Sequence, residues 1–387
     1  MDYTRILSKK SQIMKPSGIR KFFDIAAGVP DIISLSVGEP DFDTPWLIRR
    51  DAIRVLEEGK TAYTSNAGLF PLRKAVSDYF KRTIHNEYNP ENEIIITVGG
   101  SEAIDIAVRA LVNPDDEVIV PQPCFVSYAP IVELTGGVAV TAATYAENEF
   151  KLTPEILKPL ITPKTKAIIL SYPSNPTGAV MRKHELEAIA EILRGTDIII
   201  ISDEIYSELT YGEPHVSIAE LPGMKERTIV VNGFSKAFAM TGWRLGFCAA
   251  PAPISEQILK IHQYAIMCSP TISQHAAVVA LNDCVNEVAE MVSEYDMRRR
   301  LVVESLNRIG LSCFTPEGAF YVFPSVKKSG LSSQEFCKCL INEKKVAVVP
   351  GDAFGECGDG FIRISYAYSI KHLTIAIKRI EEFINEI

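Results

Sequence analysis

The chain has 387 residues, of which 47% are hydrophobic and 23% are charged, as in an ordinary soluble globular protein. This composition excludes an intrinsically disordered chain and predicts two or three domains, at roughly 100 to 200 residues each. The formal net charge of −8 argues against nucleic acid as the main partner, because a phosphate backbone requires an excess of Lys and Arg.

No apolar run approaches the roughly 20 residues that span a bilayer, and the N-terminus lacks the basic-then-apolar pattern of an export signal. We therefore expect a soluble cytoplasmic protein without a membrane partner. The eight cysteines are scattered and form no C-x-x-C motif, which favours reduced thiols. Only Cys337 and Cys339 lie close together, and a zinc site needs more ligands than these two supply. We expect no metal.

In chain order, short β-rich runs alternate with helical stretches between about residues 94 and 250. This alternation is typical of an α/β fold, in which helices cover both faces of a sheet. The isoleucines at 198–201 lack the alternation of a half-exposed strand, which favours burial of both faces and therefore a mostly parallel sheet. The predicted strands are the seven β-rich runs at 94–98, 117–120, 137–141, 167–171, 198–202, 228–231 and 245–249.

Gly99-Gly100-Ser101 is expected to open a helix that runs through Val108, and further helices should start near Pro154, Lys183 and Pro253. Beyond residue 253 the pattern changes to a long amphipathic helix, three shorter strands and a final helix. We expect these at 286–309, at 319–323, 346–349 and 361–365, and at 370–387.

This change of pattern predicts two domains. Residues 46–284 would form a large domain, and residues 1–45 with 285–387 would form a smaller α+β domain. The long helix would connect them.

Ligands of open α/β sheets bind beyond the carboxyl ends of the strands, and polar residues follow several of the predicted strands. Three of these features also have an ordinary structural explanation. Asp203 could be a helix N-cap, and Gly99-Gly100-Ser101 could be a plain strand-to-helix turn. Lys236 could be solvated, although lysine is seldom buried without a partner. The full set is Gly99, Gly100, Ser101, Glu102, Asn175, Asp203, Tyr206, Ser235 and Lys236.

Together these residues indicate one chemistry. A glycine-rich helix N-terminus with Ser235 and Arg244 provides donors for a phosphate. Lys236 provides an amine for a Schiff base, Asp203 a partner for a pyridinium, and the amide and phenol provide hydrogen bonds to a ring oxygen. This combination favours pyridoxal phosphate. The sequence contains no G-x-G-x-x-G and no G-x-x-x-x-G-K-[ST] motif.

The chain resembles the class I/II pyridoxal-phosphate aminotransferases of fold type I, over about residues 15 to 380. Within the family, residues 17–20, 262–264 and 318–321 are most similar to bacterial aromatic and N-acetyl-diaminopimelate aminotransferases. The segments that carry the family resemblance are 36–41 (SVGEPD), 63–68 (YTSNAG), 174–178 (SNPTG), 202–206 (SDEIY), 235–236 (SK) with 242–246 (GWRLG), and 361–365 (FIRIS).

The resemblance implies that Lys236 is the catalytic residue, which binds the cofactor covalently and then moves the substrate proton. Asp203 would pair with the pyridine nitrogen and stay charged, with a lowered pKa. Asn175 and Tyr206 would hydrogen-bond the ring oxygen, and Phe125 would stack on the ring.

The same resemblance implies a phosphate site and a homodimer with a shared active site. Ser101, the backbone of Glu102, Ser235 and Arg244 would hold the phosphate. Tyr63 would come from the neighbouring subunit.

For the substrate, the resemblance implies that Arg363 clamps the α-carboxylate, with the Gly38 backbone and Asn175 beside it. Aspartate-specialised relatives carry a lysine where this chain has Ser101, so a preference for aspartate is not implied. Arg20 is a candidate for the distal carboxylate of glutamate.

The expected activity is amino transfer between an L-amino acid and a 2-oxo acid such as 2-oxoglutarate. The amino acid would be aromatic, N-acetyl-diaminopimelate or similar. Two alternatives remain: a carbon–sulfur lyase or decarboxylase of the same fold, and an amino-acid sensor that binds pyridoxal phosphate. The sensor normally carries an added DNA-binding domain, for which this chain has neither the length nor the charge.

Overall fold

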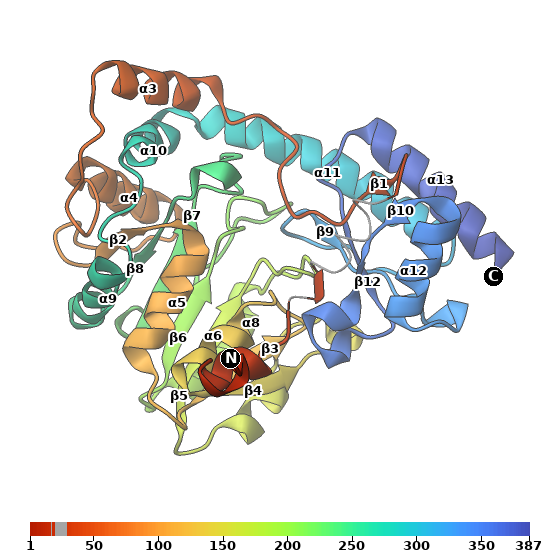
Figure 1. Ribbon diagram of the computed structural model, residues 1–387, viewed down its shortest axis with the longest axis horizontal. Coiled ribbons are helices and arrows are strands. Elements are labelled where there is room, and N and C mark those ends of the chain that lie inside the picture. The colour runs from red at the N-terminus through yellow and green to blue at the C-terminus, as the bar shows by residue number, and fades with distance from the viewer. Residues whose placement is uncertain (17, 20–28) are drawn as a thin grey trace.

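A seven-stranded sheet forms the centre of the molecule (Figure 1). The computed structural model describes residues 1–16, 18–19 and 29–387. The strand order is β2-β8-β7-β6-β5-β3-β4, and only β8 runs antiparallel to its neighbours. The predicted mostly parallel sheet is thus confirmed. Its strands are β2 Ile94–Thr97, β3 Glu117–Gln122, β4 Val138–Ala143, β5 Thr165–Ser171, β6 Ile199–Asp203, β7 Thr228–Gly233 and β8 Gly246–Ala249.

Neighbouring residues of the central strand β6 pack into different cores, which explains its continuous apolar sequence. Ile200 belongs to a cluster with residues of α8 Lys183–Leu193. Ile201 belongs to a cluster with residues of α5 Gly99–Leu111 and α9 Ala252–Ala265. Successive side chains of a strand point to opposite faces, so both faces of the sheet are covered by helices, as the four isoleucines predicted.

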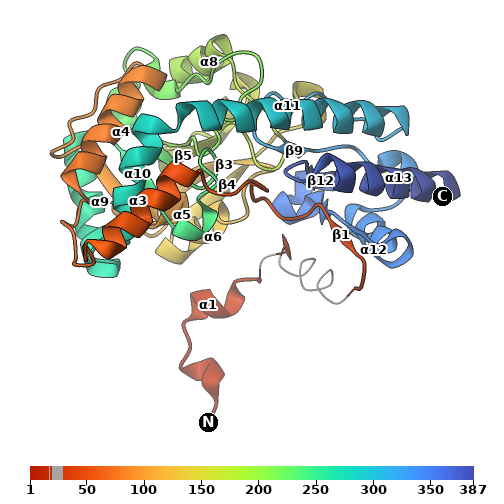
Figure 2. The same ribbon diagram turned by 90° about the horizontal axis from the view of Figure 1, so that it is seen from above.

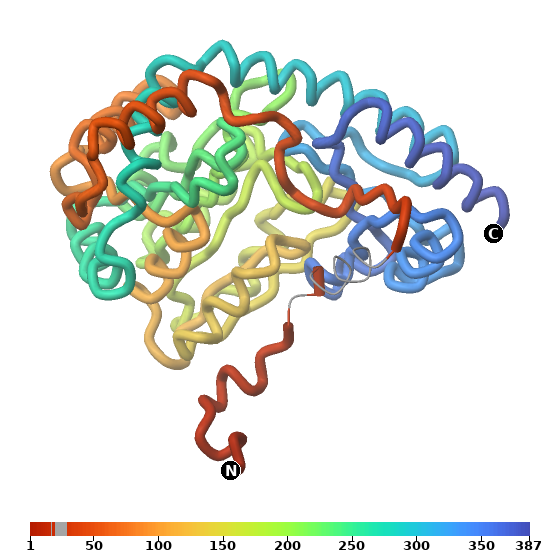
Figure 3. The backbone as a smooth tube through the Cα atoms, turned by 45° about the horizontal axis from the view of Figure 1, so that its top comes forward, coloured from red at the N-terminus to blue at the C-terminus, as the bar shows by residue number. Residues whose placement is uncertain are grey.

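The remaining helices surround this sheet and extend along the C-terminal part (Figures 1 and 3). Helix α5 begins at Gly99 as predicted and continues to Leu111, three residues beyond the expected end. The helix expected near Pro154 is a single turn. The other helices are α1 Lys9–Ile13, α3 Trp46–Glu57, α4 Phe70–Thr83, α6 Tyr128–Thr135, α7 Pro154–Leu157, α10 Thr271–Asp283, α11 Val285–Arg308, α12 Ser333–Lys344 and α13 Ile370–Glu386.

The C-terminal part contains two small sheets beside the long helix α11 (Figure 1). One has the order β11-β12-β9. In the other, β1 pairs in parallel with β10, so a segment near the N-terminus joins the C-terminal part as expected. The division into two domains stays a prediction. The strands are β1 Ile33–Ser34, β9 Tyr321–Val322, β10 Val346–Ala347, β11 Val349–Pro350 and β12 Ile362–Ser365.

The N-terminal residues extend away from the rest of the molecule in Figure 2. Lys10 is one attachment point, since its Nζ donates to the carbonyl of Leu134 at 3.3 Å. Among the helices that the structure describes, none has the length and apolar character needed to cross a membrane. All eight cysteines lie in the described part, and none of them forms a disulfide.

Candidate active site

A pocket of about 290 Å³ lies at the carboxyl ends of β5, β6 and β7. The N-terminus of α5 and strand β12 also contribute to its wall. Most residues that the sequence singled out therefore meet in one place, although they come from distant parts of the chain. Those that line the pocket are Gly38, Ser101, Phe125, Asn175, Asp203, Tyr206, Ser235, Lys236, Arg244 and Arg363.

Lys236 follows β7, and its amine lies inside the pocket. Its Nζ donates to the carbonyl oxygen of Gly38 at 2.6 Å. The pKa of the Lys236 amine is lowered to about 8, mainly by burial; the carboxylates of Glu39 and Asp203 oppose this fall, and two nearby arginines add to it. A substantial fraction of this amine is neutral near physiological pH. It can therefore attack a carbonyl group.

Asp203 is the last residue of β6 and is 6% exposed. Its Oδ2 accepts a hydrogen bond from the hydroxyl of Tyr128 at 2.6 Å, and its Oδ1 accepts one from the backbone N–H of Ile205 at 3.2 Å. Burial raises the pKa of Asp203, and these donors and the amine of Lys236 oppose that rise. In the protein by itself desolvation outweighs the groups that favour the carboxylate. The lowered pKa expected from the sequence applies to a carboxylate beside the pyridinium, and it stays a prediction.

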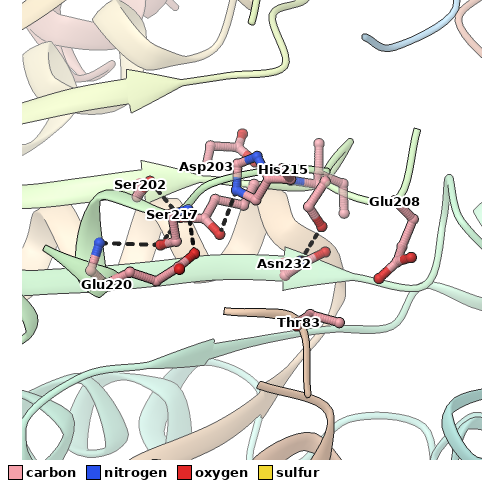
Figure 4. A network of polar contacts seen from close by, with 12 residues as sticks. Thr83, Ser202, Asp203, Glu208, His215, Ser217, Glu220 and Asn232 are labelled. Atoms are coloured by element: carbon pink, nitrogen blue, oxygen red, sulfur yellow. Dashed lines mark hydrogen bonds and ion pairs between the residues drawn. The ribbon is translucent and has the colours of Figure 1, made fainter. Parts of the chain in front are cut away.

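A buried polar network lies next to Asp203 and holds the end of β6 (Figure 4). Ser202 and Ser217 each donate to Oε1 of Glu204, at 2.9 and 2.6 Å. Nε2 of His215 lies 3.0 Å from Oε2 of the same carboxylate. The two hydroxyls satisfy Oε1 of Glu204, whereas Oε2 and Nε2 of His215 lie close together without a hydrogen bond. These contacts tie the backbone that carries Asp203 to the loop before η4 Ile218–Glu220.

Arg363 lies on β12 and is 3% exposed. Its Nη1 donates to Oδ1 of Asn175 at 2.8 Å, and its Nη2 donates to the carbonyl of Ser36 at 2.5 Å. Over the described chain, Nε of Arg363 has no hydrogen-bond partner, and its two terminal nitrogens donate to neutral acceptors only. Because buried arginines are normally paired, this guanidinium is available to an anion inside the pocket.

Aromatic rings form part of the same wall. The rings of Phe125 and Tyr128 meet edge to face, with centroids 5.7 Å apart. The hydroxyls of Tyr206 and Tyr321 lie 2.8 Å apart. The pocket therefore offers a flat apolar surface at Phe125 and a phenol at Tyr206, as expected.

The glycine-rich turn at the start of α5 lies against Arg244. Gly99 has a φ of +78°, and a Cβ on it would lie 2.9 Å from Nη2 of Arg244. On the other side, a Cβ on Gly246 would lie 2.6 Å from the carbonyl carbon of Gly99. Glycine at both positions thus lets a helix N-terminus, the Ser101 hydroxyl and a guanidinium approach one another, which is the arrangement that binds phosphate.

The side chain of Glu102 has a partner away from the pocket. Its Oε1 lies 2.7 Å from Nδ1 of His262, which is fully buried in α9, and its Oε2 accepts from the backbone N–H of Val98. Only the backbone of Glu102 can face a ligand at the N-terminus of α5, as the sequence analysis expected. The carboxylate instead ties the turn to α9.

Of the expected residues that the structure describes, Tyr63 and Glu102 are absent from the lining of this pocket. Tyr63 is 80% exposed and is absent from the pocket lining of its own chain. Arg20 lies outside the described residues.

Sequence reasoning missed Tyr128 and Tyr321, both of which line the pocket. Tyr321 lies in the segment 318–321, which contributes to the resemblance. Tyr128 follows Phe125 by three residues, which is the spacing of one helical turn. That spacing could have drawn attention to it.

The residues present fit pyridoxal phosphate. Arg244, Ser101, Ser235 and the start of α5 line one side of the pocket, and a Cβ on Gly99 would intrude between the turn and the Arg244 guanidinium. Within the same pocket lie an amine of lowered pKa on Lys236 and a carboxylate on Asp203. These are the groups that the cofactor's aldehyde and pyridine nitrogen require.

Residues 30–380 match the family model described as aminotransferase class I and II. The chain is 54% identical to the Bacillus subtilis protein named "Putative aminotransferase YugH", covering 99% of each chain. It is 49% identical to the aspartate aminotransferase of Pyrococcus abyssi, covering 98% of each.

Among solved structures, the aromatic aminotransferase of Pyrococcus horikoshii is 46% identical to this chain. It superimposes with a TM-score of 0.91 over 95% of this chain and 99% of that one. The chain belongs to the class I and II aminotransferases. It is a transaminase of fold type I that depends on pyridoxal phosphate, and the family expected from the sequence is confirmed.

Proposed function

We propose that this aminotransferase moves an amino group from an aromatic L-amino acid, N-acetyl-diaminopimelate or a similar donor to a 2-oxo acid such as 2-oxoglutarate. The observation that best supports this active site is the state of the Lys236 amine. It lies in the pocket with a pKa lowered to about 8, beside Asp203 and Arg363. When bound, pyridoxal phosphate supplies an aldehyde that accepts the amino group and a ring that takes up electrons from the substrate's Cα–H bond.

Lys236 is proposed as the catalytic residue. Its neutral amine binds the cofactor aldehyde, and once substrate has displaced it the same Nζ carries the proton removed from Cα. The bond from Nζ to the Gly38 carbonyl at 2.6 Å supports this role, because it holds the amine inside the pocket. Lys236→Ala should abolish amino transfer and the yellow colour of the holoenzyme, and a yellow, active variant would refute the assignment.

Four residues are proposed to hold the ring. Asp203 pairs with the pyridine nitrogen, supported by its position at the end of β6 and by the donors that favour its ionised form. Asn175 and Tyr206 donate to the ring oxygen. Phe125 covers one face of the ring, supported by its position in the pocket wall beside Tyr128.

The phosphate is proposed to lie at the start of α5. Ser101, the backbone amide of Glu102, Ser235 and Arg244 would supply its donors, supported by the close approach of Gly99 to the Arg244 guanidinium. The positive end of the helix dipole adds to their effect.

Arg363 is proposed to bind the α-carboxylate of the substrate, with Gly38 and Asn175 beside it. The free Nε of this buried guanidinium supports the role, because a carboxylate can accept two parallel bonds from Nε and one terminal nitrogen. A carboxylate held in this way fixes the orientation of Cα relative to the ring, which is the positioning that proton removal requires.

The proposed preference for an aromatic or similarly large side chain has a structural reason. Among the described residues that line the pocket, the cations are Lys236, Arg244 and Arg363, each with a proposed role of its own. Ile19 contributes an apolar wall instead. Arg20 remains the proposed partner of the distal carboxylate of glutamate.

A panel of amino donors with 2-oxoglutarate tests this preference. The kcat/KM for phenylalanine and tyrosine should exceed that for aspartate, and the reverse order would refute it. Arg20→Ala should weaken glutamate more than phenylalanine. An equal effect on both would remove Arg20 from the site.

We further propose a homodimer in which Tyr63 of each subunit completes the phosphate site of the other. The exposure of Tyr63 in its own chain supports this. Mixing inactive Tyr63→Ala with inactive Lys236→Ala protein, followed by subunit exchange, should restore activity, because one site of each hybrid dimer is then fully native. If no activity returns although hybrid dimers form, the site is not shared.

The division into a large domain at residues 46–284 and a small domain at residues 1–45 and 285–387 is also proposed. The pairing of β1 with β10 supports it. A cytoplasmic location is proposed because the eight unpaired cysteines suit a reducing compartment. Cell fractionation tests the location, and limited proteolysis near residues 45 and 285 tests the boundaries.

A further inference from the structure

Tyr321 connects three parts of the active site. It lies on β9, is 1% exposed, and lines the pocket. Its hydroxyl is 2.8 Å from the hydroxyl of Tyr206. Its ring lies under the guanidinium of Arg363, with 4.5 Å between Cζ and the ring centroid.

The position of the Tyr321 hydroxyl is fixed from several sides. A Cβ on Gly38 would lie only 2.1 Å from Oη of Tyr321, so the hydroxyl is packed against the Cα of Gly38. The ring meets Phe320 edge to face at 4.9 Å and Tyr206 at 5.8 Å. These contacts leave the Tyr321 hydroxyl little room to move to a hydrogen-bond partner other than Tyr206.

We propose that Tyr321 is a positioning residue whose hydroxyl donates to Oη of Tyr206 and so directs the Tyr206 proton to the ring oxygen of the cofactor. The inference rests on the proposed role of Tyr206 at that oxygen. A phenol has one proton. If Tyr206 gives its proton to the ring oxygen, the bond between the two hydroxyls requires Tyr321 to be the donor.

The electrostatics of the pair favour this direction. Burial raises the pKa of both phenols, and the Arg363 guanidinium opposes the rise at both; at Tyr321, whose ring lies under it, it is the largest opposing cause. The pKa of Tyr206 is raised well above its ordinary value, with burial as the main cause and Tyr321 adding to it. The more acidic phenol is the better donor, and chained hydrogen bonds strengthen one another.

The consequence is a link between the substrate-binding arginine and the ring oxygen. The charged groups around the phenol pair are Arg363 on β12, Lys236 after β7 and Asp203 at the end of β6. A substrate carboxylate that neutralises Arg363 would make Tyr321 a weaker donor. The Tyr206 bond to the ring oxygen would then weaken when substrate binds.

The test is a pH titration of the holoenzyme's visible absorption. Donors to the ring oxygen favour its anionic form, and so lower the pH at which the proton shared with the nitrogen of Lys236 is lost. Tyr321→Phe keeps the ring on Arg363 and removes only the hydroxyl. The spectral midpoint should rise by about 0.5 to 1 pH unit, the effect of one lost hydrogen bond.

A second buried phenol pair provides the matched control. The hydroxyls of Tyr366 and Tyr211 lie 3.3 Å apart, and neither residue lines the pocket. Tyr366→Phe should leave the spectral midpoint unchanged. A rise of the same size in this control would overturn the inference, because the shift would then reflect a general effect of removing a buried hydroxyl.

A double-mutant comparison separates the inference from the proposed role of Tyr206. Tyr206→Phe should raise the midpoint, and adding Tyr321→Phe should raise it no further. An unchanged midpoint in Tyr206→Phe overturns both the role of Tyr206 and the inference. A raised midpoint in Tyr206→Phe with an unchanged midpoint in Tyr321→Phe overturns the inference alone. Should Tyr321→Phe not fold, Tyr321→Met is measured instead, with the same expected rise and the same refutation.

Discussion

Gly246→Ala should weaken the phosphate site because the added methyl group has no room. An ideal Cβ at this position would lie 2.6 Å from the carbonyl carbon of Gly99 and 2.7 Å from the backbone nitrogen of Gly100. Ordinary van der Waals contact begins at 3.4 Å, so the turn that opens α5 must move by about 0.8 Å. Both obstacles are backbone atoms, which cannot rotate away.

The expected size of the effect follows from the cost of such overpacking, about 1 to 3 kcal/mol. If this cost falls on the cofactor complex, the dissociation constant for pyridoxal phosphate rises by roughly 5- to 150-fold. If it falls on the fold, the melting temperature of this chain drops by about 1 to 4 °C. The turn carries the phosphate donors, so we expect the first effect to dominate.

The assay is a titration of the apoprotein with pyridoxal phosphate and with pyridoxal, which lacks the phosphate. Gly246→Ala should weaken pyridoxal phosphate far more than pyridoxal. Gly242→Ala is the matched control, because a Cβ there meets nothing within 4 Å. Wild-type affinity for pyridoxal phosphate in Gly246→Ala, or an equal loss for both ligands, would refute the reasoning.

Three further predictions concern the pocket. Lys236→Met should stabilise the apoprotein at pH 7 by about 3 kcal/mol, from a pKa lowered from 10.5 to about 8. Between pH 8 and pH 10.5 the Lys236 amine of the unfolded wild type binds more protons than that of the folded wild type. The free energy of unfolding of the wild type therefore rises with pH in this range, and the stability difference between the variant and the wild type should vanish by about pH 10.5. Urea unfolding at several pH values checks this. Tyr128→Phe removes the 2.6 Å bond to Asp203 and should raise the pyridoxal phosphate dissociation constant about tenfold or more, measured by fluorescence titration; unchanged affinity would contradict it. Arg363→Lys loses the two-pronged bond to the substrate carboxylate and should lower kcat/KM for every amino donor by roughly 10- to 100-fold without changing cofactor affinity. Steady-state kinetics and a cofactor titration check this, and an equal loss of cofactor affinity would indicate a purely structural effect instead.

The sheet was predictable because its strands carry their own signal. The run at 198–201 has no polar alternation, and the structure shows why: Ile200 and Ile201 pack into cores on opposite faces of β6. Strand ends were also visible, since Asp203 ends β6 and the polar Asn232 with Gly233 ends β7, three residues before Lys236. Burial of both faces is a local property of a strand, so a local pattern reveals it.

Side-chain partners within the site were much less predictable. Nothing in the segment 318–321 indicated that the Tyr321 hydroxyl would meet Tyr206, which lies 115 residues earlier. The raised pKa of Asp203 in the protein without a bound cation was not predicted either. The sequence suggested a partner for the carboxylate but could not weigh that partner against complete burial.

The sequence by itself determined the order of the seven strands of the central sheet, their ends to within about two residues and, through its motifs, the family. Only the tertiary structure decided which of those residues meet. Arg363 contacts Asn175 across 188 residues, and Lys236 contacts Gly38 across 198. Such contacts depend on how the N-terminal segment and the C-terminal strands pack against the sheet. Hydrophobic periodicity shows which face of a single helix or strand is buried, but it does not show which elements lie next to one another.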